Sequence, residues 1–191
     1  MSSNPFSTRF IRPGAIPFVF PEDQSADGVA QRLRERNWWG QIIGDHGSGK
    51  STLLATLVPA LEAAGRTVVS VGLHQNERRL PALDQSTFSS ATQLVIDGYE
   101  QLSWWSRWRV NALCRRRGAG LLVTAHTDVG LPMIYETQPS EELARSVVAR
   151  LIAEPNGRIT SDDVSNAYAA TNGNVREALF RLYDVYQRRQ G

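Results

Sequence analysis

Lysine is almost absent from this chain of 191 residues: Lys50 is the only one, whereas arginine occurs twenty times. Cysteine is equally rare, because Cys114 stands alone and so excludes a disulfide bridge within the chain. A lone thiol fits the reducing cytoplasm, and no Cys and His residues have the spacing of zinc ligands. These absences favour a cytoplasmic protein without a structural zinc site.

Long apolar runs and a strong excess of charge are also missing. No segment reaches the roughly 18 apolar residues of a membrane-spanning helix. The N-terminal residues MSSNPFSTRFIRPGAIPF lack the continuous apolar stretch of a secretory signal. A net charge of +2 does not by itself indicate a nucleic-acid partner. We therefore expect a globular protein with one sizeable core.

The single lysine lies in the segment GDHGSGKST, which matches the P-loop pattern G-x-x-x-x-G-K-[ST]. Glycines let backbone N–H groups converge on a phosphate, and the following helix adds its N-terminal dipole. An ammonium is a compact point charge, whereas a guanidinium is a wide fork that does not fit beneath a wrapped phosphate, which explains the lysine. The predicted nucleotide-binding residues are Gly44, Asp45, His46, Gly47, Ser48, Gly49, Lys50, Ser51 and Thr52.

Two further groups suit the chemistry of a nucleotide with Mg²⁺. The Ser51 hydroxyl is placed to bind the metal, and Asp97, which ends the apolar segment QLVID, resembles the Walker B aspartate. Asp97 can instead cap the next helix. Glu100 is the nearest carboxylate that can orient an attacking water, although it equally suits a helix N-terminus. We therefore predict ATP and Mg²⁺ as cofactors, with Lys50 and Glu100 as catalytic residues.

A polar segment, VTAHT, ends a further apolar run and contains Thr124, His126 and Thr127. Each of these side chains can hydrogen-bond the γ-phosphate from a strand tip, and histidine can also sense its charge. The alternative is a set of ordinary polar residues at a surface loop. We include His126 among the catalytic candidates.

The pattern of apolar runs predicts an α/β fold. Five apolar segments have the character of strands, and they alternate with helical segments at about 50–64 and 100–117. The predicted strands lie at about 38–44, 67–73, 92–98, 120–126 and 132–137. Continuous apolar strands of this kind form a parallel five-stranded sheet covered by helices on both faces. The predicted domains are an extended N-terminal arm (1–24), a P-loop core (25–138) and a small C-terminal lid of three short helices (139–191).

These motifs together resemble an AAA+ ATPase, or a close relative among P-loop NTPases with an additional strand between the P-loop and Walker B strands. The resemblance covers about residues 25–189. The segment TNGNVREALFRLYDVY is similar to the AAA+ lid motif, in which a Gly-Asn pair precedes the sensor 2 arginine. The resemblance implies that Arg176 reaches the γ-phosphate from the lid and that His126 stands near the sensor 1 position.

The chain departs from that family at two informative positions. Gly98 follows Asp97, where a glutamate is usual. No arginine lies between Thr124 and Tyr135, where an arginine acting on a neighbouring subunit is often found, and this argues against a ring oligomer.

The segment LSWWSRWRVNALCRRRG combines Trp104, Trp105 and Trp108 with five arginines. Three interpretations are open: the tryptophans fill the core, the helix docks a protein partner, or the arginines contact nucleic acid. Trp38 and Trp39 either contact the adenine or pack in the core.

The sequence thus predicts a Mg-dependent ATP-binding protein, a slow ATPase that acts as a nucleotide-controlled switch on an unknown partner. The alternatives are a small-molecule P-loop kinase and a non-hydrolysing nucleotide-binding interaction module. The absence of an Asn-Lys-x-Asp guanine motif, which would need a second lysine, argues against a GTPase.

Overall fold

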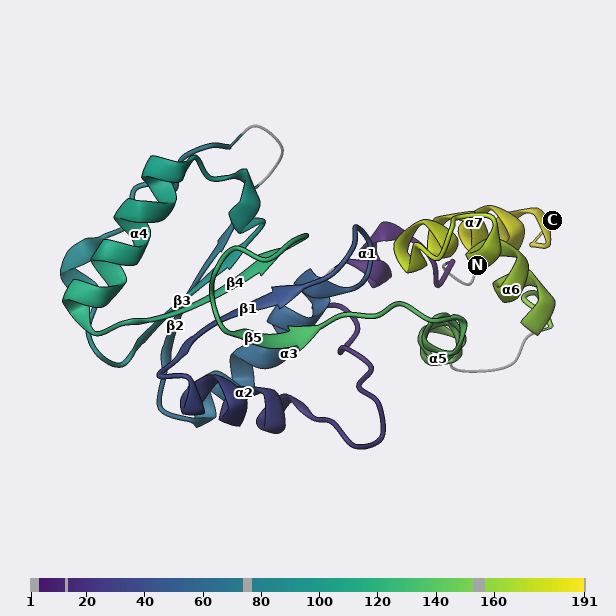
Figure 1. The fold of residues 1–191 in the computed structure, drawn as a ribbon. Helices are drawn as coiled ribbons and strands as arrows, with labels where there is room; N and C mark the ends of the chain where they lie inside the picture. Colours follow the sequence, from purple (N-terminus) through teal and green to yellow (C-terminus); the bar gives the residue numbers. More distant parts are fainter. Residues whose placement is uncertain (1–3, 13, 74–76, 153–156, 191) are drawn as a thin grey trace.

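The computed structural model describes residues 4–12, 14–73, 77–152 and 157–190 (Figure 1). Five strands form one sheet in the order β2-β3-β4-β1-β5, and every neighbouring pair is parallel. The strands are β1 (Trp39–Ile43), β2 (Thr67–Gly72), β3 (Thr92–Asp97), β4 (Gly120–Ala125) and β5 (Met133–Glu136). The predicted fold class is confirmed, and β4 is the additional strand between the P-loop strand β1 and the strand β3 that ends in Asp97.

Seven α-helices and two short 3₁₀ turns accompany the sheet in the described ranges. The helices are α1 (Thr8–Ile11), α2 (Ala26–Glu35), α3 (Lys50–Ala63), α4 (Trp104–Arg117), α5 (Glu141–Leu151), α6 (Ser161–Ala169) and α7 (Val175–Arg188), and the turns are η1 (Gln85–Thr87) and η2 (Tyr99–Gln101). Side-chain oxygens of Ser25, Ser140 and Thr160 accept hydrogen bonds at the N-termini of α2, α5 and α6. Each cap satisfies a backbone N–H group that has no partner within its helix, and so helps to fix where the helix begins.

Helices cover the two faces of the sheet unequally. Helices α2 and α3 pack on one face through a cluster that includes Leu33, Leu57 and Leu122. Helix α4 covers the other face, where Val110 and Cys114 pack with Leu121 (Figure 1). All six residues of β4 are buried, because that strand is central and covered on both faces.

The three tryptophans of α4 do not fill the core. Trp104, Trp105 and Trp108 are 67%, 66% and 57% exposed, so the core-filling interpretation is wrong. The buried positions of the helix, Val110 and Cys114, are four residues apart and define the face on the sheet. The tryptophans lie on the opposite side of the helix.

The helix predicted to begin near Glu100 begins instead at Trp104. Gly98 adopts a left-handed backbone, with φ +80°, and Glu100 lies in the turn η2 that follows it. The Ser103 side chain then accepts a hydrogen bond from the Ser106 amide and caps α4. Glu100 is therefore held by a tight turn next to the end of β3.

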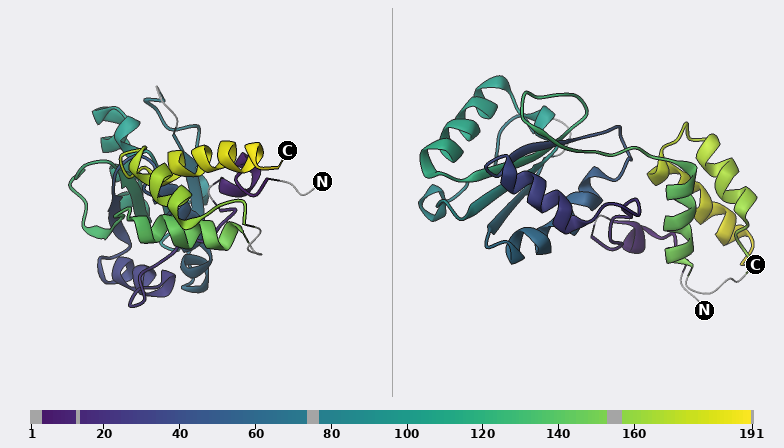
Figure 2. Two further views of the ribbon diagram at one scale, coloured as in Figure 1. Left: turned by 90° about the vertical axis from the view of Figure 1, so that its right-hand side faces the viewer. Right: turned by 60° about the horizontal axis from the view of Figure 1, so that its bottom comes forward.

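Helices α5, α6 and α7 form a small bundle beyond one end of the sheet (Figure 2). The N-terminal segment contacts both parts. Phe6 is fully buried among the bundle helices and packs edge-on against Tyr186, whereas Phe18 joins the core on α3. The segment is not extended throughout, since α1 interrupts it. It packs on the body through its aromatic residues, as their spacing suggests.

Candidate functional site

The P-loop connects β1 to α3. Gly47 and Gly49 have φ angles of +74° and +94°, a backbone region that L side chains rarely adopt, so glycine is needed for this turn. Helix α3 begins at Lys50 directly after Gly49, which leaves its first N–H groups at the loop. The sequence pattern therefore produces the expected strand–loop–helix unit.

The Lys50 ammonium points back into its own loop. Nζ donates to the carbonyl oxygens of Gly44 and Asp45 at 2.6 and 2.8 Å, and it lies 3.2 Å from Nδ1 of His126. Burial lowers the pKa of Lys50, although the charges of Glu100 and Asp97 oppose this shift. A positive charge is thus held where the loop backbone converges.

His126 joins the P-loop to the turn that carries Glu100. Its Nε2 lies 3.2 Å from Glu100 Oε1, and its ring stacks on His46 with the centroids 3.7 Å apart. Burial and the charge of Lys50 lower the pKa of His126, so the neutral imidazole is favoured. Nδ1 also lies 3.0 Å from the Gly44 carbonyl oxygen. One neutral tautomer therefore donates from Nε2 to Glu100 and accepts from Lys50 at Nδ1, whereas the other donates from Nδ1 to Gly44.

The other carboxylate oxygen of Glu100, Oε2, is buried and has no hydrogen-bond partner among the described residues. A buried acceptor without a donor is costly unless a ligand or water supplies one. Glu100 Oε2 is therefore an acceptor that lacks a donor in this conformation.

Thr124 orients Asp97 at the edge of the sheet. The Thr124 hydroxyl donates to Asp97 Oδ1 at 2.6 Å and accepts from the Gly98 amide at 2.9 Å. The Thr124 hydroxyl is therefore already hydrogen-bonded to Asp97, at the end of the neighbouring strand β3. Thr127 does not line the cleft described next.

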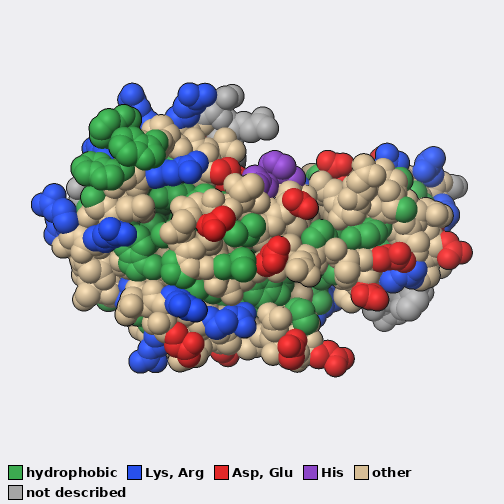
Figure 3. Space-filling view, in the orientation of Figure 1, with side chains coloured by type: hydrophobic (Ala, Val, Ile, Leu, Met, Phe, Trp, Pro, Cys, Tyr) green, Lys and Arg blue, Asp and Glu red, His purple; other side chains and the backbone are tan. Residues whose placement is uncertain are grey.

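One cleft, with a volume of about 590 Å³, gathers most of the predicted site. It lies between the sheet and the helical bundle, where Figure 3 shows histidine side chains in a hollow of the surface. The predicted residues that line it are His46, Gly47, Ser48, Gly49, Lys50, Ser51, Thr52, Asp97, Glu100, Thr124, His126 and Arg176. Gly44 and Asp45 do not line it and instead offer their carbonyl oxygens to Lys50.

The bundle closes one side of this cleft. Arg176 lies in the first turn of α7, and its guanidinium packs 5.8 Å from the centre of the Phe180 ring on the same helix. Asn174 caps α7 by accepting from the Glu177 amide, and its side chain lies so close to Gly47 that a Cβ there would collide with it. The bundle therefore touches the P-loop directly.

Sequence reasoning did not identify the apolar wall of the cleft. The N-terminal segment supplies Ile11, Arg12, Ile16, Pro17, Phe18 and Val19, and the bundle supplies Leu143, Val147, Val175 and Leu179. The aromatic and proline residues before α2 were the available signal, but nothing in their spacing tells which surface they cover. Neither Trp38 nor Trp39 lines the cleft; both pack on the core, beneath Arg66 and Arg115 respectively.

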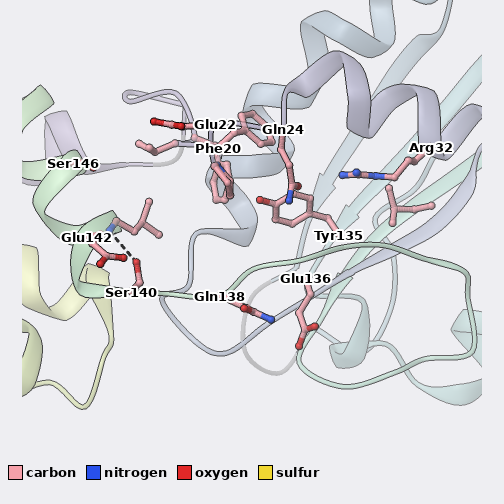
Figure 4. A pocket seen from close by; sticks show the side chains of 15 residues that line it. Phe20, Glu22, Gln24, Arg32, Tyr135, Glu136, Gln138, Ser140, Glu142 and Ser146 are labelled. Carbon is pink, nitrogen blue, oxygen red and sulfur yellow. Dashed lines mark hydrogen bonds between the residues drawn. The ribbon is translucent and has the colours of Figure 1, made fainter.

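A larger hollow, of about 830 Å³, lies between the N-terminal segment, α2, β5 and α5 (Figure 4). Phe20 and Tyr135 meet there, with the acidic side chains of Glu22, Glu136 and Glu142 around them. None of the predicted site residues lines it. Volume alone does not define a site, and we place the functional centre at the smaller cleft, which has the phosphate loop and the paired acids.

Within the described ranges, no three His, Cys, Asp or Glu side chains are grouped as metal ligands. In the same part of the chain, no helix combines the length and apolar character needed to cross a membrane.

Comparison with known proteins yields a structural neighbour and no family. No protein-family model matches the chain, and no curated protein matches it. The structure of C. elegans PCH-2 is similar with a TM-score of 0.45 and 13% sequence identity, over 94% of this chain and 72% of that chain. At this level of similarity the match does not assign the chain to a family.

Proposed function

We propose that this protein binds ATP with Mg²⁺ and hydrolyses it slowly, as a nucleotide-controlled switch of the AAA+ type. The observation that carries the proposal is the convergence of Lys50, Ser51, Asp97, Glu100 and Arg176 on one cleft from separate elements. A phosphate loop alone supports binding only. The added acids and the arginine are the groups that phosphoryl transfer requires.

The residues present fit a nucleotide with its metal ion. Two left-handed glycines and the start of α3 direct backbone N–H groups at one point, which suits a phosphate. Ser51 and Asp97 line the same cleft with oxygen ligands, the type that Mg²⁺ prefers. Mg²⁺ would neutralise charge on the phosphate oxygens. In this proposal the apolar residues of the N-terminal segment cover the adenine ring of ATP.

Glu100 is the proposed general base. Its free oxygen, Oε2, accepts a proton from water, while His126 holds the other oxygen in place. Lys50 gives up its bonds to the loop carbonyls in favour of phosphate oxygens. ATP and water then yield ADP and phosphate, with the water proton on Glu100.

The C-terminal region acts as a lid in this proposal, with the boundaries 1–24, 25–138 and 139–191 for arm, core and lid. Arg176 would leave the Phe180 ring and reach from the lid toward the γ-phosphate. The contact between Asn174 and Gly47 would couple the nucleotide state to the lid angle. In this proposal an unidentified cytoplasmic partner binds one orientation of the lid in preference to the other.

The test combines ATP binding and phosphate release, with Mg²⁺, for the wild type, Lys50→Ala and Glu100→Gln. We expect Lys50→Ala to lose both activities. Glu100→Gln should keep ATP affinity within about threefold and lose turnover by about 10²–10⁴-fold, the usual contribution of a general base. Glu62→Gln is the matched control, because Glu62 is an exposed acid at the far end of α3.

The possible contrary results differ in meaning. Failure of the wild type to bind ATP would contradict the central proposal. Binding without release, unchanged by Glu100→Gln, would indicate a nucleotide-binding interaction module. ADP formation that depends on an added small-molecule acceptor would indicate a kinase.

A further inference from the structure

Helix α4 presents an unusual aromatic surface. Three tryptophan side chains near the N-terminal end of this helix are each more than half exposed to solvent: Trp104, Trp105 and Trp108. Figure 3 shows these hydrophobic side chains projecting from the end of the molecule that is remote from the bundle. Exposed aromatic clusters of this kind mark interaction surfaces.

The same surface is strongly basic. Helix α4 contains five arginines and no acidic residue, whereas the whole chain has a net charge of only +2, so the remainder is net −3. Arg109 and Arg116 share the exposed face of the helix with the tryptophans. The segment next to the start of α4 adds Arg78 and Arg79, since the Arg78 carbonyl accepts from Ser106.

The geometry of the rings distinguishes between possible anionic partners. Trp104 and Trp105 meet edge to face, with ring planes at 74°, and Trp105 and Trp108 do so at 82°. Successive bases of a single strand stack on faces that are each open to one base, whereas here the rings cover one another's faces and edges. The cluster is a compact apolar knob on a convex helix, surrounded by arginines.

Tryptophan side chains are enriched at membrane–water interfaces, and arginines close to an anionic leaflet are attracted to its head groups. The tryptophan rings enter the boundary between head groups and acyl chains, and the arginines meet the anionic head groups. We propose that this surface, defined by Trp104, Trp105, Trp108, Arg109 and Arg116, docks the protein on an anionic lipid membrane. The inference does not depend on the proposed ATPase.

Vesicle sedimentation with the full chain tests the proposal. The probes are vesicles of phosphatidylcholine alone and of phosphatidylcholine with about 30% phosphatidylglycerol, at about 0.1 M salt. We expect binding to the anionic vesicles only, with a blue shift of tryptophan emission and a loss of binding at high salt. Replacing Trp104, Trp105 and Trp108 by Ser should weaken binding more than tenfold, and Arg109→Gln with Arg116→Gln should weaken it about fivefold per arginine.

Matched controls are Met133→Ser and the pair Arg34→Gln and Arg36→Gln, which change an exposed apolar residue and two exposed arginines elsewhere. Both should bind vesicles like the wild type. Circular dichroism and the midpoint of thermal unfolding establish that each variant is folded. Since the altered side chains point to solvent, we expect no loss of fold.

Three results would overturn the proposal. The first is absence of binding to anionic vesicles. The second is equal vesicle binding by the tryptophan variant and the wild type. The third is that a single-stranded oligonucleotide, or a second copy of the chain in light scattering, binds through the tryptophans while vesicles do not.

Discussion

At the scale of single residues, His126 has the most contacts to the proposed reacting groups. Its two ring nitrogens lie 3.2 Å from Lys50 Nζ and from Glu100 Oε1. One imidazole therefore positions both the cation of the phosphate loop and the proposed base.

A pH dependence of stability follows from the lowered pKa of His126. The unfolded chain takes up this proton near pH 6.5, whereas the folded protein does so only at lower pH. The free energy of unfolding is thus unaffected above pH 6.5 and falls as the pH drops below it, until the folded pKa is reached. Urea unfolding between pH 8 and pH 5.5 measures this loss.

The matched variant is His126→Gln, which should lack the part of the pH slope that His126 contributes. His46→Gln should retain most of it, because His46 is exposed and has only the ring contact. If the free energy of unfolding has the same pH dependence in the wild type and in His126→Gln, the folded and unfolded states bind the His126 proton equally and the prediction is wrong.

At the scale of secondary-structure elements, α4 connects two features that the sequence shows separately. Its N-terminal half carries the tryptophans, and Arg107 on the same turn donates to the carbonyl oxygens of Glu100 and Leu102 at 2.7 and 3.0 Å. The Arg107 guanidinium also packs over Tyr99, at 5.4 Å. A shift of α4 would therefore be transmitted to the turn that holds Glu100.

Helix α6 depends on one carboxylate. Asp163 forms a capping box with Thr160 and accepts two hydrogen bonds from Arg189, which lower its pKa to about 2. Asp163→Asn should reduce the free energy of unfolding by about 1–2 kcal/mol after allowance for solvent screening. The folded pKa lies below the ordinary 3.8, so this contribution is present above pH 4 and is lost as the pH falls toward 2.

Asp162→Asn is the control, because Asp162 is its exposed neighbour in the same turn. Thermal unfolding at pH 7 should separate the two variants by several degrees. A shift of equal size for both would mean that the helix dipole, and not the bonds to Thr160 and Arg189, accounts for the effect.

At the scale of the whole molecule, the bundle and the sheet meet where Asn174 touches Gly47. Gly47→Ala would place a Cβ against the Asn174 side chain, in addition to a strained φ of +74°. We expect ATP affinity to fall more than tenfold, because the P-loop and the bundle cannot both keep their positions. Equilibrium binding of a fluorescent ATP analogue measures the loss.

Gly130→Ala supplies the control for backbone strain alone. Gly130 has a similar φ of +83°, and a Cβ there would meet nothing within 4 Å. This variant should lose about 1 kcal/mol of stability and keep ATP affinity. Adding Asn174→Ala to Gly47→Ala should restore part of the affinity. If the double variant does not regain ATP affinity, the loss is caused by strain in the loop backbone and not by the collision with Asn174.

The sequence by itself determined the order of the elements, the helix caps and the phosphate loop. These are local properties: β-branched runs, an oxygen at an N-cap, and glycines at left-handed positions act within a few residues. The five strands and the start of α3 at Lys50 are accordingly where the pattern predicts them.

The tertiary structure alone decided which distant residues share the cleft and which face of α4 is exposed. Phe6 and Phe18 lie twelve residues apart in one segment, yet one packs in the bundle and the other on α3. The Trp residues of α4 are as apolar as its buried side chains, so composition could not say that Val110 and Cys114 face the sheet. Burial depends on contacts between remote parts of the chain, and these exist only once the sheet and bundle have formed.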